Sequence, residues 1–270
     1  MKRSFRSYVF VCLLGSLALL LMACGNGNNE SANTNANADN NGGESDGNTY
    51  VVGTDAAYAP MEYIDDAGDI VGIDIEIVDA IAEEMGFEVE YKNIGWDPLF
   101  PAVNNGEVDF AVSSITITEE REKEFDFTDP YYIANQLILV PEDSDVTSFN
   151  DLKDKKVSAQ MSTTGHIVVQ ELLGETSPNI VATESMPLAI SEMLNGNAEA
   201  SVGDNSTVNE YLKNNPDVDL KTVEDDSFEK ENYGLMVKKG NDELRELLNE
   251  GIQKIKDSGK LEEITGIEVE

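Results

Sequence analysis

Apolar positions change their spacing from segment to segment along the chain, and each spacing predicts a different element. One set recurs as on one face of a helix, with a glycine directly after it: Ile77, Val78, Ile81, Ala82 and Met85. Short runs of consecutive or alternating apolar residues lie between such stretches and are typical of strands. The spacing predicts strands at 50–53, 88–93, 110–112, 135–140, 156–160 and 200–203.

Capping residues and glycines mark the ends of the other predicted helices. Three of them are expected to begin at Thr164, Ser185 and Asn241, and glycine follows each one, at Gly174, Gly196 and Gly259. A further helix is expected to start at Asp97-Pro98, with proline at its first position. Strands and helices therefore alternate, which predicts an α/β architecture with mostly parallel sheets.

Polar residues directly after predicted strands are the first candidates for a site. Ligands of parallel α/β sheets bind beyond the carboxyl ends of the strands. Four polar residues meet this condition: Asp55, Ser113, Ser114 and Asp204.

The N-terminal segment has the pattern of an export signal. A positive start is followed by an apolar run at 8–23, which is short for a spanning helix. Leu21-Met22-Ala23-Cys24 resembles a bacterial lipobox, so residues 1–23 are expected to be a lipoprotein signal peptide and Cys24 to be acylated. An ordinary signal peptide that happens to contain a cysteine is the alternative. The other cysteine, Cys12, lies within the signal, so no intrachain disulfide is expected.

Composition narrows the classes of function. Residues 25–48 are rich in Asn, Gly and Ser and are expected to be a flexible linker. The chain carries 18 Lys+Arg against 53 Asp+Glu, a formal net charge of −35, which disfavours nucleic acid and anionic lipid surfaces as partners. No His and Cys cluster predicts a metal site, and no glycine-rich loop predicts a phosphate cofactor, so no cofactor is expected.

Several motifs carry a family resemblance over about residues 50–260. They are Val52-Gly53-Thr54-Asp55-Ala56-Ala57-Tyr58-Ala59-Pro60, Gly72-Ile73-Asp74-Ile75, Gly106-Glu107-Val108-Asp109, Thr116-Ile117-Thr118-Glu119-Glu120-Arg121 and Phe127-Thr128-Asp129-Pro130-Tyr131-Tyr132. In this order and spacing the sequence resembles the periplasmic-type binding proteins of amino-acid ABC importers, solute-binding protein family 3. The runs at 93–100 and 162–165 are similar to the subgroup for basic amino acids.

The resemblance implies two α/β lobes joined by two crossing strands, closing on a free amino acid, with Arg, Lys or His favoured. Lobe one is expected at 49–140 plus 233–270 and lobe two at 141–232, with crossings near 137–141 and 231–235. The implied partners are the membrane permease and ATPase subunits of an ABC importer. The implied protein is a monomer on the outer face of the cell membrane, anchored through the lipid on Cys24. Glutamine or cystine is the alternative ligand.

An amino acid is a zwitterion, so burying it requires a cation for its carboxylate and an anion for its ammonium. Arg121 matches the family arginine that binds the carboxylate, for which a planar guanidinium is well suited. Asp204 matches the family carboxylate for the ammonium. The resemblance assigns the ligand backbone further contacts: Ser113, Ser114, Thr116, Thr163 and Thr164, with Gln160 as a weaker candidate. Ser114 stands where many relatives have glycine.

The side chain of the ligand is expected to lie among Asp55, Tyr58, Glu62 and Trp96, where the aromatic rings can hold a cation and the carboxylates can pair with it. Local alternatives remain open for each group. Arg121 can be a surface residue beside two glutamates, Trp96 a core aromatic and Glu62 a solvated charge. Asp204, Thr163 and Thr164 can be simple helix caps, and His166 is assigned to the rim of the pocket or to a helix surface.

Two rival classes share this fold. A dehydratase-like enzyme would need an acid–base pair aimed at its substrate, and the pairing of Arg121 with Asp204 argues against that. The sensing domain of a receptor kinase would look alike, but no kinase motif follows. The sequence thus predicts a binding protein with no catalytic residues.

Overall fold

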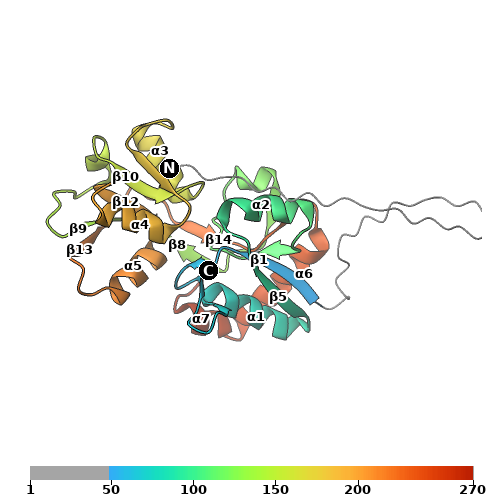
Figure 1. Cartoon of the computed structure of the whole chain (residues 1–270). Coiled ribbons are helices and arrows are strands. Elements are labelled where there is room, and N and C mark those ends of the chain that lie inside the picture. Colours follow the sequence, from blue (N-terminus) through green and yellow to red (C-terminus); the bar gives the residue numbers. More distant parts are fainter. Residues whose placement is uncertain (1–48, 270) are drawn as a thin grey trace, which may run out of the picture. The chain divides into compact units, whose positions relative to one another are not determined.

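A computed structural model describes residues 49–269, which belong to one compact unit. The predicted signal peptide, Cys24 and the predicted linker lie outside the described residues. No helix within 49–269 combines the length and apolar character needed to cross a membrane. Two five-stranded sheets with flanking helices make up most of this unit (Figure 1).

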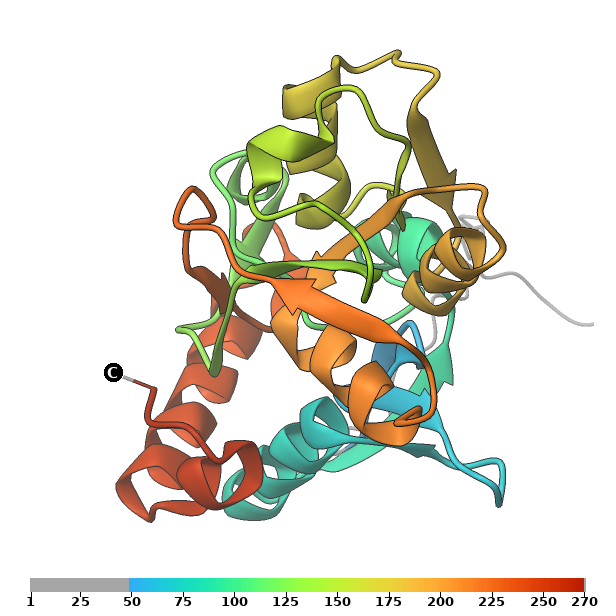
Figure 2. The ribbon, with the colours of Figure 1, turned by 90° about the vertical axis from the view of Figure 1, so that its left-hand side faces the viewer.

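The first sheet has the strand order β5-β1-β6-β15-β7. Its strands are β1 Thr49–Thr54, β5 Glu88–Asn93, β6 Phe110–Ala111, β7 Phe125–Phe127 and β15 Met236–Lys238. Its helices are α1 Ile73–Met85, α2 Trp96–Asn105, α6 Asp242–Asp257 and α7 Lys260–Thr265. We call these elements the first lobe. Helices α6 and α7 pack beside α1, so the lobe is built from both ends of the described segment (Figure 2).

The second sheet has the order β11-β10-β12-β9-β13. Its strands are β9 Gln136–Pro141, β10 Val157–Gln160, β11 Ile180–Thr183, β12 Ala200–Asp204 and β13 Leu220–Val223. Its helices are α3 Thr164–Leu173, α4 Met186–Leu194 and α5 Asn205–Asn214. We call these elements the second lobe. Two short 3-10 helices, Arg121–Lys123 and Phe149–Leu152, precede β7 and β10 respectively.

Two small sheets complete the fold. Strands β2 Ala57–Tyr58, β3 Glu62–Ile64 and β4 Ile70–Val71 form an antiparallel sheet that leads into α1. Strands β8 Tyr132–Ala134 and β14 Glu231–Tyr233 pair with each other and run between the lobes (Figure 1). The chain thus passes from lobe to lobe along an antiparallel pair.

Sheet membership corrects the expected crossing at 137–141. Strand β9 pairs with β12 and β13, so Gln136–Pro141 belongs to the second lobe, although the sequence analysis placed this run mainly in the first. The antiparallel partner of β14 is β8, the strand that directly precedes β9 in the chain. We therefore propose crossings at β8 and β14, which moves the first lobe boundary from Val140 to about Asn135.

The expectation of mostly parallel sheets is confirmed, because four of the five strands in each sheet run in one direction and a single strand is reversed. In the first sheet β1 pairs in parallel with β5 and β6, but β15 pairs antiparallel with β6 and β7. The second sheet repeats this division, because β9 is antiparallel to both of its neighbours. Each sheet is mixed because one strand enters it from a crossing rather than from a strand–helix–strand unit.

Most predicted helix ends are confirmed, with one shift. Helix α1 ends at Gly86, whose left-handed φ of 75° suits glycine. Helix α2 begins at Trp96 rather than at Asp97-Pro98, so Pro98 is its third residue. Proline is tolerated there because the first four N–H groups of a helix have no intrahelical partner. The shift places Trp96 at the start of the helix.

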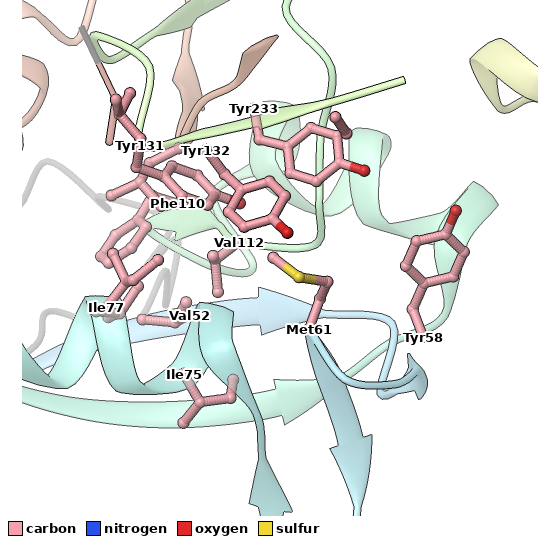
Figure 3. Close-up of a cluster of buried hydrophobic side chains, with 14 of the residues drawn as sticks. Val52, Tyr58, Met61, Ile75, Ile77, Phe110, Val112, Tyr131, Tyr132 and Tyr233 are labelled. Carbon is pink, nitrogen blue, oxygen red and sulfur yellow. The ribbon is translucent and has the colours of Figure 1, made fainter. Parts of the chain in front are cut away.

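Three tyrosines from the crossing region lie in the core close to the first sheet. The rings of Tyr132 and Tyr233 stack with centroids 5.5 Å apart, and Tyr131 and Tyr233 are fully buried. Figure 3 shows them beside Met61, with Val52 and Val112 of the same cluster close by. This packing fixes the crossing strands against the first lobe.

Candidate functional site

A cavity with an empty volume of ≈ 300 Å³ opens where the two lobes meet. It is lined by the twelve residues that the sequence analysis predicted: Asp55, Tyr58, Glu62, Trp96, Ser113, Ser114, Thr116, Arg121, Gln160, Thr163, Thr164 and Asp204. The structure brings these residues together, and their role in binding stays a prediction.

The fold gathers them because parallel strands end at the same edge of a sheet. Asp55 follows β1 and Ser113 follows β6 in the first lobe, while Gln160 and Asp204 end β10 and β12 in the second. The two edges face the same cavity, as the rule for ligand sites in α/β sheets predicts. Four of the lining residues come from the second lobe, so neither lobe forms the site alone.

Arg121 is the cation that lines the cavity. Its Nη1 donates to the carbonyl of Thr116 at 2.7 Å, and its Nη2 lies 3.5 Å from the carbonyl of Ser162 in the second lobe. Its guanidinium carbon lies 5.2 Å from the centre of the Trp96 ring, a cation–π distance. Burial lowers the pKa of Arg121 to about 10, opposed by the charges of Glu231 and Asp204, so it stays charged at neutral pH.

Asp204 is the buried anion on the second-lobe side, with 6% of its surface exposed. Although it precedes α5, its side chain does not cap that helix. Its Oδ2 accepts from the Tyr233 hydroxyl at 2.5 Å and its Oδ1 from Gln136 Nε2. Burial, followed by the charge of Glu231, raises the pKa of Asp204 to about 7, and hydrogen bonds from Tyr233 and other neighbours oppose this. A cation bound there would favour the ionised form.

Asp55 and Gln160 join the lobes at another part of the cavity. Gln160 Nε2 donates to Asp55 Oδ2 at 3.0 Å. The Oε1 of Gln160 and the indole N–H of Trp96 are buried and have no hydrogen-bond partner within residues 49–269. Buried polar atoms normally have partners, so these two are suited to contact a ligand. Burial raises the pKa of Asp55, while the hydrogen bond from Gln160 lowers it.

Glu62 is buried, with 1% of its surface exposed, so the alternative of a solvated charge is wrong. It accepts hydrogen bonds from the hydroxyls of Ser113 and Ser114 at 3.0 and 3.3 Å. Asp74 lies beside it and accepts from the Ser114 N–H and the Tyr131 hydroxyl. Burial first, then the neighbouring Asp74, raises the pKa of Glu62 well above its usual range, and burial raises that of Asp74 to about 6.

Ser114 adopts a φ of 48°, in the left-handed region that favours glycine. This conformation aims its N–H at Asp74 Oδ2, 2.7 Å away. This left-handed conformation gives a physical reason for the glycine that many relatives have at this position. The serine hydroxyl adds a donor that reaches Glu62.

Thr163 and Thr164 mark the start of α3. The Thr163 hydroxyl caps the helix by accepting from the His166 N–H at 3.2 Å, and Thr164 is the first helical residue. His166 is 8% exposed, and its Nδ1 accepts from the Ser162 N–H. It is therefore buried beneath the start of the helix and does not line the cavity, contrary to the assignment to a rim or helix surface.

Three residues of the surrounding network were not predicted. Asp74 lies within one of the family motifs, but the sequence predicts no role for it. It predicts none for Gln136 or Glu231 either. Gln136 Nε2 contacts Asp204, Thr164 and Glu231. Nothing local in the sequence signals Glu231, which follows a charged run at 224–230 that is typical of a solvated loop. Within the described residues no group of His, Cys, Asp and Glu is placed to hold a metal ion.

Two lobes around a cavity with a cation from one lobe and an anion from the other define a binding protein for a small dipolar ligand. The model of the bacterial extracellular solute-binding proteins, family 3, matches residues 50–266. The chain belongs to this family.

Comparisons with individual proteins agree. A probable histidine-binding protein of Neisseria gonorrhoeae is 38% identical, with 81% of this chain and 82% of that protein covered. The arginine-binding extracellular protein ArtP of Bacillus subtilis is 30% identical, with 96% of each covered. The crystal structure of the arginine-, lysine-, histidine-binding protein ArtJ from Geobacillus stearothermophilus has a TM-score of 0.77 and 44% identity, with 80% of this chain and 93% of that one covered.

Proposed function

We propose that this protein is the extracytoplasmic receptor of an ABC importer and binds a free basic L-amino acid between its lobes. The observation that carries the proposal is that Arg121 of the first lobe and Asp204 of the second line one cavity. These charges match the carboxylate and ammonium that every free amino acid has. Relatives named for histidine or arginine binding support the same class of ligand.

Binding alone explains how such a receptor would work. A ligand whose carboxylate contacts the first lobe and whose ammonium contacts the second favours the closed arrangement, because only closure completes both pairings. The antiparallel pair β8–β14 is where the lobes would turn. The permease would then recognise the closed form, and no bond in the ligand would be made or broken.

The excess of carboxylates in the cavity favours a basic side chain. Asp55, Glu62 and Asp204 line it, against the single guanidinium of Arg121. Arginine or lysine brings two positive charges and one negative, whereas glutamine brings one of each. Burial raises the pKa of all three carboxyls and a bound cation favours their ionised forms, so the ligand with the additional cation is favoured. Asp55 and the free Gln160 Oε1 are acceptors for its N–H groups.

Calorimetric titration with all twenty amino acids and cystine tests the proposal. Trp96 is the one tryptophan of the chain and lines the cavity, so its fluorescence gives a second readout. We expect heat and a fluorescence change with Arg, Lys or His. If none of the titrated compounds bound, or if a bound compound were turned over, the receptor function would be disproved. Preference for glutamine or cystine would disprove the basic specificity.

Replacing Asp55 with Asn is expected to weaken arginine binding about 30-fold or more, because one partner of a buried charge pair is lost. Glutamine has no side-chain cation, so its affinity should change little. Asp97→Asn removes the same charge from an exposed neighbouring position and is the matched control. The affinities are measured by calorimetry. Equal losses for arginine and glutamine would show that Asp55 does not bind the side chain.

We also propose that the mature protein begins at Cys24 and is held at the membrane by lipid on that residue, where it delivers its ligand to a permease with ATPase subunits. Support comes from the lipobox pattern and from relatives described as extracellular. Mass spectrometry of the mature N-terminal peptide provides the test. An unmodified Cys24, or cleavage elsewhere, would overturn this part of the proposal.

A further inference from the structure

Glu231 connects both lobes although it lies outside the cavity lining. It belongs to the crossing strand β14. Its Oε2 accepts a hydrogen bond from the hydroxyl of Thr116 in the first lobe at 2.6 Å and another from the hydroxyl of Thr164 in the second lobe at 2.8 Å. Both threonines line the cavity, so one carboxylate oxygen holds a lining hydroxyl from each lobe.

These two hydrogen bonds determine what the threonines can offer a ligand. A threonine hydroxyl has one proton to donate and lone pairs that accept. Both protons are directed to Glu231, so toward the cavity the two oxygens can act only as acceptors. A ligand carboxylate is acceptor-only and gains nothing from them, whereas an ammonium group is a donor of three hydrogen bonds.

The second oxygen of Glu231 extends this arrangement to Asp204. Glu231 Oε1 accepts from Gln136 Nε2 at 2.9 Å, and the same nitrogen donates to Asp204 Oδ1. The amide of Gln136 therefore holds two carboxylates close to each other. This side of the cavity combines two negative charges with two hydroxyl acceptors.

We propose that Glu231 is a positioning residue that makes the hydroxyls of Thr116 and Thr164 acceptors and so reserves their side of the cavity, with Asp204, for the ligand ammonium. The carboxylate of the ligand is then left to Arg121, the cation that lines the cavity. This inference rests on the proposed function, which already pairs the carboxylate with Arg121 and the ammonium with Asp204, and adds the residue that enforces this orientation.

The test pairs one protein variant with ligands that lack one charged group. Glu231→Gln keeps the size of the side chain but replaces an acceptor oxygen with an NH₂ donor, which frees at least one threonine proton. The ligands are arginine, agmatine (which has no carboxylate) and 5-guanidinopentanoic acid (which has no ammonium). Dissociation constants come from thermal-shift titrations at high ligand concentration, which also register weak binding. Glu229→Gln makes the same charge change at an exposed position two residues away.

We expect Glu231→Gln to weaken arginine and agmatine about tenfold or more and to leave the acid within about twofold, because hydrogen bonds to charged groups carry this much affinity. Glu229→Gln should behave like the wild type. An equal loss for all three ligands would reduce Glu231 to a structural role, and a loss confined to the acid would reverse the orientation. Either result overturns the proposal.

Two further measurements distinguish failure of this inference from failure of the proposed function and from misfolding of the variant. If the wild-type protein binds no amino acid, the proposed function fails; if it binds and Glu231→Gln binds equally well, only this inference fails. Thr116→Val removes one acceptor at nearly constant volume and serves if Glu231→Gln does not fold. It should weaken arginine and agmatine but spare the acid, and equal effects on all three would again overturn the proposal.

Discussion

Replacing Arg121 with alanine is expected to abolish amino-acid binding at concentrations that saturate the wild type. The substitution removes the guanidinium that reaches from Thr116 to the second-lobe carbonyl of Ser162 and packs against Trp96. A ligand carboxylate would then be buried without a cation. Removing one partner of a buried, hydrogen-bonded charge pair costs about 2–5 kcal/mol, which corresponds to a loss of about 30- to 5,000-fold.

Thermal shift and tryptophan fluorescence with arginine measure this loss. The matched control is Arg245→Ala, which removes the other arginine of residues 49–269, on α6 and away from the cavity. Arg121→Lys should recover only part of the affinity, because an ammonium cannot bind two oxygens as a guanidinium does. Undiminished binding by Arg121→Ala would remove the basis for the proposed function.

Arginine affinity is expected to fall about tenfold for each pH unit below about 7, because Asp204 must lose a proton to bind the ammonium. Burial raises the pKa of Asp204 to about 7, so the free receptor carries a proton there under acidic conditions. A bound cation favours the ionised carboxylate and lowers this pKa, so proton release accompanies binding below pH 7 and not above it. One pKa unit corresponds to 1.36 kcal/mol, or tenfold.

Calorimetry in two buffers with different ionisation heats counts the released protons: about one near pH 6 and close to zero near pH 8. Glu62 and Asp74 also have a raised pKa, so Asp204→Asn is needed to assign the proton. That variant should bind weakly and lose the proton release. Constant wild-type affinity from acidic to alkaline pH would show that Asp204 does not carry the pairing.

The sequence was sufficient to predict residues whose place follows from the ends of strands. Asp55, Ser113 and Asp204 each lie just after a predicted strand, and parallel strands bring such positions to one edge. Arg121 and Trp96 follow from the family motifs rather than from periodicity. The twelve predicted residues therefore meet in one cavity, although they are spread over some 150 positions of the chain.

Residues on the crossing strands were not predicted, because the hydrogen bonds that give them a role join positions far apart in the sequence. Glu231 meets Thr116 and Thr164 across separations of 115 and 67 residues, which no local pattern records. The apolar run of β9 identified a strand but not its neighbours, so it was placed in the wrong lobe. The sequence predicts that the last helix ends at Gly259, but a second, short helix, α7, begins directly after that glycine.

The position of β15 between β6 and β7 has a consequence for how the chain folds as it is made. Every strand of the second sheet has been synthesised once β13 is complete, so that lobe can assemble from one continuous stretch. The first sheet still lacks an inner strand at that moment, and both β6 and β7 present open edges that invite mispairing. Loss of the last few dozen residues would therefore damage the first lobe, which carries Arg121, and leave the second lobe complete.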